Sequence, residues 1–377
     1  MRVIIAGDFC DKFRVTDALA RKDYESLFSN ITEVVNSADY SFVNFEFPIV
    51  AKEGKPIPKC GPNLKGHPNA IDAIKYAGFN CCTLANNHIL DQGEECLLDT
   101  KNRIEAAGIK TVGAGANLSE ASEILYIENV EQRVAVINCC ENEFSIATNN
   151  SSGANPLNPI RQYYKIQEAR QKADYVLVIV HGGHELYQLP SPRMKETYRF
   201  FVDAGADAVI NHHQHCYSGY EVYKDKPIFY GIGNFLFDRK GVRDSIWNEG
   251  YMVELDFTKC RVEYTLIPYR QGGDILGVIL IKDEESIRRF KSSLLHLNDI
   301  ICDNDKLSKA HTEWMAASSK CFRLALEPYY SKIGIALYMK NILPSFMNKK
   351  KRLQIVNYIE CEAHLDRLRY ILKNDLR

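Results

Sequence analysis

The chain has 377 residues, of which 46% are hydrophobic and 25% are charged. This composition is typical of globular proteins and excludes the disordered, collagen-like and coiled-coil classes, and the length predicts about two to three domains. Lys and Arg (47) balance Asp and Glu (48), which gives a net charge of −1. Because a dedicated nucleic-acid-binding protein normally carries a basic excess, we expect no nucleic-acid partner.

The apolar segments and the cysteines predict a cytoplasmic protein. The first apolar run, residues 3–6, is too short for a secretory signal. No stretch approaches the roughly 18–20 apolar residues of a membrane helix, so we expect no transmembrane segment. The 12 cysteines form no C-x-x-C motif, and the pairs Cys81-Cys82 and Cys139-Cys140 lie in apolar runs. We interpret them as buried free thiols of a reducing compartment rather than as disulfides.

In chain order, a helical pattern, a glycine and a short apolar strand follow one another three times. The three units are 68–77, Gly78 and 79–84; 94–107, Gly108 and 109–112; and 195–204, Gly205 and 207–210. Further strands are predicted at 3–6, 40–45, 134–140, 175–180 and 227–230, with a hairpin at 252–257 and 262–267. This alternation predicts an α/β fold in which helices cover a largely parallel sheet.

The pattern changes beyond about residue 283. Strand signals end there, and the remaining residues indicate helices that are interrupted at Pro328, Pro344 and Gly334. We therefore predict a main domain at 1–283 and a helical C-terminal extension at 284–377. Apolar residues at helical spacing between 287 and 297 favour packing of the extension onto the main domain.

Polar residues collect where the predicted strands end. They are Asp8; Asn44 and Glu46; Asn86, Asn87, His88 and Asp91; His181, His184 and Glu185; His212, His213 and His215; and Asn234. Six of the ten histidines are in this set. Taken singly, each has an ordinary explanation, such as a helix cap for Asp8 or a polar turn for 213–215. Because the carboxyl ends of parallel strands share one edge, the whole set favours a ligand site there.

The residue types at this edge indicate a metal site. Mixed oxygen and nitrogen donors suit first-row divalent ions such as Mn, Fe or Zn better than Mg or Ca. The number of donors favours two ions. Two ions about 3.5–4 Å apart can clamp a phosphoryl group and activate a water for in-line attack.

An ordered series of motifs carries a family resemblance over about residues 1–240. The motifs are Gly7-Asp8, Asn44-Phe45-Glu46, Leu84-Ala85-Asn86-Asn87-His88 with Asp91, His181-Gly182-Gly183-His184-Glu185, His212-His213-Gln214-His215 and Gly233-Asn234-Phe235. The series resembles the capsule-synthesis (CapA, poly-γ-glutamate biosynthesis) family, a branch of the calcineurin-like metallophosphoesterases. The resemblance implies a four-layered αββα sandwich around a dinuclear metal site.

The resemblance also implies a role for each motif residue. Asp8 and His215 correspond to ligands of one ion, Asn87, His181 and His213 to ligands of the other, and Glu46 to a bridging carboxylate. His88 corresponds to the acid that protonates the leaving oxygen, Asp91 orients it, and Glu185 contacts substrate or water. Cys10, Asn44, Asn86, His184, His212 and Asn234 are candidates for contacts with the substrate or with the ligands.

Three positions depart from the family pattern. Cys10 stands where the wider superfamily has a histidine, and it is either a thiolate ligand or a buried thiol. Glu46 is longer than the usual aspartate, and Gly182 replaces an aromatic residue, which opens the pocket to a larger substrate. Many family members also carry an N-terminal membrane anchor, which we do not expect here.

Two functions follow from the resemblance. The first is a metal-dependent hydrolase that cleaves a phosphoester or another charged bond during the synthesis of a capsule or surface polymer, on an anionic or polymeric substrate such as a glycan or polyglutamate. The second is a non-catalytic component that binds the polymer and retains the fold. The departures at Cys10 and Glu46 favour the second.

Overall fold

The computed structural model of the protein describes residues 1–51 and 53–374. They form two compact units, Met1–Ser308 and Lys309–Arg377. The units divide after residue 308, whereas the sequence analysis places its boundary after residue 283. The helix α9 (Glu284–Cys302) belongs to the first unit, because its apolar face, which includes Phe290 and Leu294, is buried.

A first sheet of eight strands forms the centre of the first unit. Its strand order is β16-β15-β14-β1-β2-β3-β4, and β13 pairs with β1. The strands are β1 (Arg2–Cys10), β2 (Tyr40–Phe45), β3 (Cys81–Thr83), β4 (Lys110–Val112), β13 (Asn234–Phe237), β14 (Glu249–Phe257), β15 (Val262–Gln271) and β16 (Val278–Leu280). From β1 to β4 the pairing is parallel, and β14, β15 and β16 pair antiparallel. The predicted hairpin is confirmed as β14 and β15.

A second sheet of six strands has the order β11-β12-β10-β9-β7-β6. Its strands are β6 (Leu125–Glu128), β7 (Arg133–Cys140), β9 (Tyr175–His181), β10 (Ala208–His212), β11 (Tyr220–Tyr223) and β12 (Lys226–Phe229). The central strands β7, β9, β10 and β12 are parallel. These central strands are almost wholly buried, as expected for a sheet that is covered on both faces.

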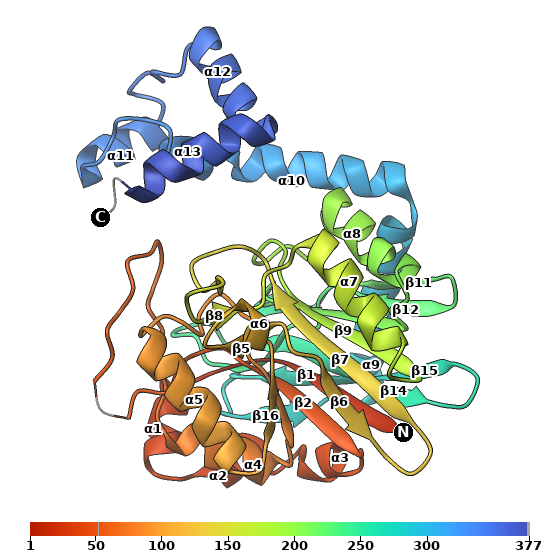
Figure 1. Ribbon diagram of the computed structural model, residues 1–377. Helices are drawn as coiled ribbons and strands as arrows, with labels where there is room; N and C mark the ends of the chain where they lie inside the picture. Colours follow the sequence, from red (N-terminus) through yellow and green to blue (C-terminus); the bar gives the residue numbers. More distant parts are fainter. Residues whose placement is uncertain (52, 375–377) are drawn as a thin grey trace. The chain divides into compact units, whose positions relative to one another are not determined.

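The two sheets face each other, with helices outside (Figure 1). The Tyr175 ring in β9 lies 5.1 Å from the Phe257 ring in β14, and the Phe229 ring in β12 lies 5.4 Å from the Tyr264 ring in β15. The helices on the first sheet are α1 (Arg14–Ala20), α2 (Tyr24–Phe28), α3 (Thr32–Asn36), α4 (Asn69–Ala77) and α5 (Glu94–Ala106). The second sheet is covered by α7 (Pro159–Arg170) and α8 (Pro192–Asp203). The predicted four-layered αββα sandwich is confirmed.

Short elements complete the first unit. They are β5 (Ala114–Gly115), which pairs with β8 (Gly153–Ala154), the helix α6 (Leu118–Ala121) and the 3₁₀ turn η1 (Ile246–Asn248). The predicted order of helix, Gly78 and strand is also confirmed, since Gly78 ends α4. Gly78 has a φ of 100°, the left-handed conformation that a glycine adopts without strain at the end of a helix.

The regular elements of the second unit, in its described part, are helices joined by irregular segments. Its helices are the later part of α10 (Asn304–Leu324), α11 (Lys332–Met339), α12 (Lys349–Glu360) and α13 (Glu362–Asn374). Pro328 and Pro344 lie between helices as predicted, but Gly334 lies inside α11, so the predicted interruption there is wrong. Within residues 1–51 and 53–374, no helix combines the length and the apolar character that crossing a bilayer requires.

Candidate metal centre

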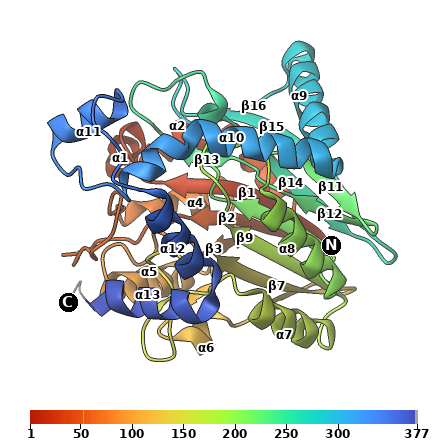
Figure 2. The same cartoon turned by 90° about the horizontal axis from the view of Figure 1, so that it is seen from above.

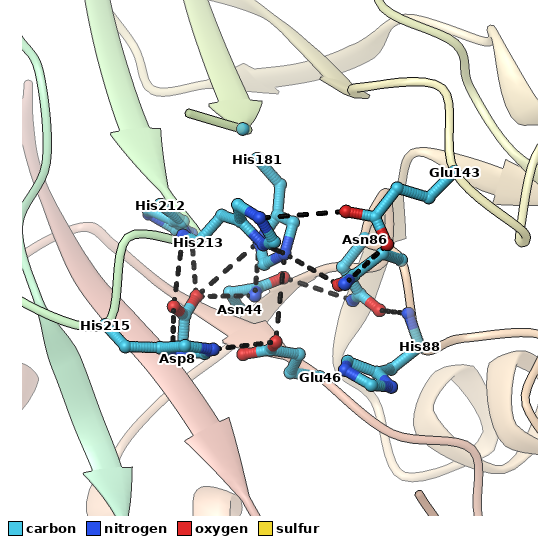
Figure 3. A network of polar contacts seen from close by, with 12 residues as sticks. Asp8, Asn44, Glu46, Asn86, His88, Glu143, His181, His212, His213 and His215 are labelled. Atoms are coloured by element: carbon cyan, nitrogen blue, oxygen red, sulfur yellow. Dashed lines mark hydrogen bonds and ion pairs between the residues drawn. The ribbon is translucent and has the colours of Figure 1, made fainter. Parts of the chain in front are cut away.

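Buried polar side chains gather where strands of the two sheets end. In the first sheet β1, β2 and β3 are parallel to one another (Figure 2), and in the second sheet β9 and β10 are parallel, so the carboxyl ends share one edge within each sheet. The two sheets bring these ends together, since His181 Nδ1 at the end of β9 lies 3.7 Å from Asp8 Oδ1 in β1. The residues at this edge are Asp8, Asn44, Glu46, Asn86, Asn87, His88, His181, His212, His213 and His215, and all are buried. Figure 3 shows that many of these side chains point toward one another.

A backbone irregularity in β1 determines the direction of the Asp8 side chain. The register with β2 shifts between Ala6 and Asp8, and the register with β13 shifts between Asp8 and Phe9. A Cβ atom on Gly7 would lie 1.9 Å from the carbonyl oxygen of Gly233, so the close approach of the two segments requires glycine. Such bulges redirect side chains, and this one brings the Asp8 carboxylate into the space between the sheets.

The Asp8 carboxylate is held by several donors. Asn44 donates from Nδ2 to Oδ1 at 2.7 Å, and the His213 backbone N–H donates to Oδ2 at 3.1 Å. His215 Nδ1 lies 3.4 Å from Oδ2. Burial opposes the charged form, but the His215 contact and the nearby imidazole of His181 outweigh it, so the pKa of Asp8 lies well below its ordinary value.

Glu46 lies at the centre of the cluster without a hydrogen-bond partner. Its side chain is completely buried, and among the residues described neither Oε1 nor Oε2 has a partner. His181 Nε2 and His215 Nε2 each lie 3.8 Å from Oε1. Burial, and then the charge of Asp8, raises the pKa of Glu46 far above its ordinary value. A buried carboxylate with two unsatisfied oxygens is a costly arrangement that a bound cation relieves.

A second set of ligand atoms surrounds His181 Nε2. Asn87 Oδ1 lies 3.1 Å from it and His213 Nδ1 lies 3.0 Å from it. On the other side of the ring, His181 Nδ1 lies 3.2 Å from Asn44 Nδ2. Burial, reinforced by His213, lowers the pKa of His181 far below its ordinary value, and burial also lowers the pKa of His213. Both rings are therefore neutral, which is the form of histidine that binds metals.

The turn after β10 brings two histidines to the same site. His213 and His215 have φ angles of 87° and 55°. A positive φ is uncommon for residues other than glycine and costs about 1–3 kcal/mol, and such strain is concentrated at functional sites. Asn234 fixes the second ring, because its Oδ1 lies 2.8 Å from His215 Nδ1. This contact leaves His215 Nε2 directed toward Glu46.

His88 lies at the rim of the cluster and is held from behind by a carboxylate. Its Nδ1 lies 2.6 Å from Asp91 Oδ2, and its backbone N–H donates to Asn86 Oδ1 at 3.1 Å. Lys59 donates from Nζ to Asp91 Oδ1 at 2.6 Å, and Leu64 N–H donates to Oδ2 at 2.6 Å. Burial lowers the pKa of His88 and outweighs the opposing effect of Asp91.

Four other predicted residues have different surroundings. Cys10 belongs to the hydrophobic core, and burial raises the pKa of its thiol far above the ordinary value. His212 Nδ1 lies 3.7 Å from Asp8 Oδ1, and its buried Nε2 has no partner among the described residues. The His184 ring packs against Tyr187. Glu185 is exposed, and its charge adds to the effects of burial and Asp8 in raising the pKa of Glu46.

Sequence reasoning missed two residues that contact the predicted ones. Lys59 lies in an irregular segment, and no sequence pattern connects it with Asp91. Glu143 accepts a hydrogen bond from Asn87 Nδ2 at 3.1 Å, and its Oε1 lies 3.8 Å from His213 Nε2. Glu143 follows the end of β7, which is parallel to β9, so the rule that polar residues at strand ends share one edge could have found it.

The donor atoms form three overlapping groups whose members are close enough to share a cation. The groups are Asp8, His181 and His212; Glu46, His181 and His213; and Asp8, Glu46 and His215. In each group the donor atoms lie within 4.8 Å of one another. Glu46 is common to two groups, and its oxygens have no partner in the described part of the chain. A carboxylate and imidazole set of this kind fits first-row divalent ions.

The chain matches a family of known proteins. Residues 2–239 match the family described as "Bacterial capsule synthesis protein PGA_cap". The chain is 32% identical over 251 residues to the capsule biosynthesis protein CapA of Bacillus anthracis, over 64% of this chain and 61% of that protein. It is 30% identical over 243 residues to the PGA biosynthesis protein CapA of Bacillus subtilis (strain 168), over 64% of this chain and 63% of that protein. The matched region thus spans less than two thirds of either relative.

A solved structure is also similar. It is a putative 5'-nucleotidase from Staphylococcus aureus, with 17% sequence identity and a TM-score of 0.45, and the similarity covers 78% of this chain and 58% of that one. The family match is decisive because it covers well over half of the chain. The chain belongs to the family of bacterial capsule synthesis proteins, and the resemblance of the strand-end motifs to the CapA family is confirmed.

Proposed function

We propose that the protein is a metal-dependent hydrolase that cleaves a phosphoester or another anionic bond during the synthesis of a capsule or surface polymer. One observation carries the proposal. The Glu46 carboxylate is buried without a hydrogen-bond partner among the described residues, and His181 Nε2 and His215 Nε2 each lie 3.8 Å from its Oε1. A pair of divalent ions would satisfy both of its oxygens, and the family of the chain supports the link to a polymer.

The groups of donor atoms suggest how two ions are held. We assign Asp8 and His215 to one ion and Asn87, His181 and His213 to the other, with Glu46 between them. When bound, such ions polarise a phosphoryl oxygen and lower the pKa of water, and so supply a nucleophile at neutral pH. The mixed oxygen and nitrogen donors favour Mn, Fe or Zn.

Residues of the chain complete the reaction. As an imidazolium, whose charge Asp91 stabilises through Nδ1, His88 would donate its Nε2 proton to the leaving oxygen and become neutral. Asn44 holds Asp8 in place from β2, and Asn86 fixes the backbone at His88. The described geometry thus supports a cluster of donor atoms that would hold the ions and, at its rim, one residue, His88, that would supply the proton.

The substrate that we propose is an anionic polymer or a precursor of one. The B. subtilis relative is named a PGA biosynthesis protein, which supports polyglutamate as one candidate and a glycan as another. The cysteines in the described residues are free thiols, several of them buried, which supports the predicted cytoplasmic location.

The test uses the full chain stripped of metal by a chelator and reloaded with Mn²⁺, Fe²⁺ or Zn²⁺ separately. We expect one to two bound equivalents and hydrolysis of bis-p-nitrophenyl or p-nitrophenyl phosphate. Asp8→Asn should lose both metal and turnover. The matched control is Asp225→Asn, which makes the same chemical change in the exposed turn between β11 and β12.

Two results would contradict the proposal. A wild-type protein that binds no metal would remove its basis. Metal binding with background turnover across a panel of phosphate, carboxylate and amide substrates would instead favour a non-catalytic component that binds the polymer.

A further inference from the structure

Glu143 connects the two sheets at the candidate metal centre. It lies in the loop after β7, and its side chain is 38% exposed. Its Oε2 accepts a hydrogen bond from Asn87 Nδ2 at 3.1 Å, and its Oε1 lies 3.8 Å from His213 Nε2 (Figure 3). Asn87 follows β3 of the first sheet and His213 follows β10 of the second, so one carboxylate contacts a residue from each sheet.

The contact with Asn87 determines which end of the amide faces the cluster. An ionised carboxylate only accepts hydrogen bonds, so it pairs with the NH₂ end of an amide and not with the oxygen. Because Glu143 takes the NH₂ end, Asn87 directs Oδ1 toward His181 Nε2, which lies 3.1 Å away. The oxygen is the only atom of the amide that can bind a cation.

The contact with His213 acts in the same direction. A carboxylate facing Nε2 favours the proton on that nitrogen, which leaves Nδ1 with its lone pair free. His213 Nδ1 is the atom that lies 3.0 Å from His181 Nε2. The two contacts of Glu143 therefore direct Asn87 Oδ1 and His213 Nδ1, the two atoms that could bind a metal, toward His181 Nε2.

We propose that Glu143 is a positioning residue that orients Asn87 and His213 together for the second ion. The inference rests on the proposed function, because it assumes that two ions bind. In the described part of the chain, the donor groups close enough to share a cation do not include Glu143. Its position behind the ligands, rather than among them, supports an indirect role.

Glu143→Gln is the direct test, with Mn²⁺ alone as the probe. The new amide side chain offers one acceptor and one donor group to two partners that both donate, so one contact becomes unfavourable. Substituting a residue that contacts metal ligands typically lowers metal affinity by about 10–100-fold. In isothermal titration and equilibrium dialysis, we expect the second dissociation constant for Mn²⁺ to rise by about that factor, with the first unchanged. The unchanged first site also reports that the variant is folded.

The matched control is Glu131→Gln. Glu131 is exposed and lies at the opposite end of β7, in the turn that connects it with β6. The substitution makes the same chemical change next to the other end of the same strand, away from the cluster, so both Mn²⁺ dissociation constants should stay at the wild-type value.

The double variant Asn87→Asp with Glu143→Gln separates positioning from direct ligation. In this swap the NH₂ group of the introduced glutamine donates to the introduced aspartate, and the glutamine oxygen accepts from His213 Nε2. Both contacts are restored, with donor and acceptor exchanged only between residues 87 and 143, and the net charge is the same as in the wild type. We expect the second Mn²⁺ site to return to within a few-fold of the wild-type affinity. Because aspartate is a stronger cation ligand than asparagine, the swap is compared with Asn87→Asp alone, in which two carboxylates face each other. If adding Glu143→Gln to Asn87→Asp lowers the affinity of the second site, Glu143 is itself a ligand and the proposal is overturned.

The remaining outcomes distinguish this inference from the proposed function. If the wild type and Glu143→Gln bind Mn²⁺ with equal stoichiometry and affinity, Glu143 has no positioning role, although the hydrolase proposal stands. If the wild type binds no second Mn²⁺ ion, the two-ion site fails and this inference fails with it. Loss of the second site in the single variant and its recovery in the swap support the inference, whether or not the protein hydrolyses the phosphoesters.

Discussion

Lys59 forms a buried ion pair with Asp91, with 2.6 Å between Nζ and Oδ1 and side chains that are only 2% and 0% exposed. The other carboxylate oxygen of Asp91 lies 2.6 Å from His88 Nδ1. The lysine therefore supplies the opposite charge that a fully buried carboxylate needs while it holds the imidazole. Lys59 Nζ also lies 3.3 Å from the carbonyl oxygen of Asn87. A single ammonium group therefore contacts the residue before His88, the predicted acid, and the Asp91 carboxylate after it.

Replacing Lys59 should destabilise the fold. Lys59→Met removes the opposite charge from the buried Asp91 carboxylate and leaves its Oδ1 without the ammonium donor, which costs about 3–5 kcal/mol. Urea unfolding monitored by circular dichroism measures this loss of unfolding free energy. The control is Lys55→Met, whose ion pair with Glu95 is more than 80% exposed on both sides and should contribute little. A loss below about 1 kcal/mol for Lys59→Met would show that Asp91 does not depend on this partner.

Replacing His88 should abolish turnover and leave metal binding intact. A positioned acid contributes about 10²–10⁴-fold to a rate, so His88→Ala should lower kcat on a p-nitrophenyl phosphoester by that factor. The metal content should not change, because His88 is outside the donor groups found among the described residues. His296→Ala, on the exposed face of α9, is the control. Wild-type turnover in His88→Ala would exclude the residue as the acid.

The convergence of the site could be predicted because it follows from topology. Parallel strands of one sheet share an edge, so residues at the ends of β9 and β10 had to meet once these segments were recognised as strands. The meeting of these residues with the end of β1 depends on how the two sheets stack, because β1 belongs to the other sheet. The structure brings His181 and His215 within 3.7 Å and 3.4 Å of the Asp8 carboxylate. Their roles as ligands remain predictions.

The residues that sequence reasoning missed depend on loop geometry and on a local irregularity. Lys59 reaches Asp91 from a segment without regular structure, so no periodic pattern indicates the pairing. In a regular strand, Asp8 and Cys10 would point to the same face, since side chains alternate with a period of two. The register shift between Asp8 and Phe9 breaks that alternation, and Phe9 and Cys10 both belong to the hydrophobic core. A bulge of this kind is not visible in the sequence.

Metal binding should release protons. In the ion-free protein, burial, and then Asp8, raises the pKa of Glu46 far above its ordinary value. Burial opposes the charged form of His215, but Glu46 and Asp8 outweigh it and raise its pKa from 6.5 to about 9. Because Glu46 raises the pKa of His215 only while it is ionised, the pair holds at least one proton near pH 7 that a cation must displace, so the apparent affinity for Mn²⁺ should rise with pH until about pH 9.

Isothermal titration in two buffers with different ionisation enthalpies measures the number of protons released. Glu46→Gln should release about one proton fewer, because the amide does not titrate. The sign for stability follows from the same shift. The raised pKa of His215 stabilises the ion-free fold fully below pH 6.5, and this contribution is lost as the pH rises through about 9. A heat of binding that is the same in both buffers would contradict the prediction.

Replacing Cys10 should affect packing and not metal binding. The thiol is completely buried in the core, and burial, with the charge of Glu46 adding to it, keeps its pKa far above the ordinary value, so the neutral form persists. A neutral thiol is a poor ligand. Cys10→Ala should therefore cost about 1 kcal/mol of unfolding free energy through lost packing and leave the number of bound Mn²⁺ ions unchanged. Cys260→Ala, in the exposed turn between β14 and β15, should change neither quantity. If Cys10→Ala lost one equivalent of Mn²⁺, the sulfur would have to be a ligand, and the bulge at Asp8 would have to rearrange when the ion binds.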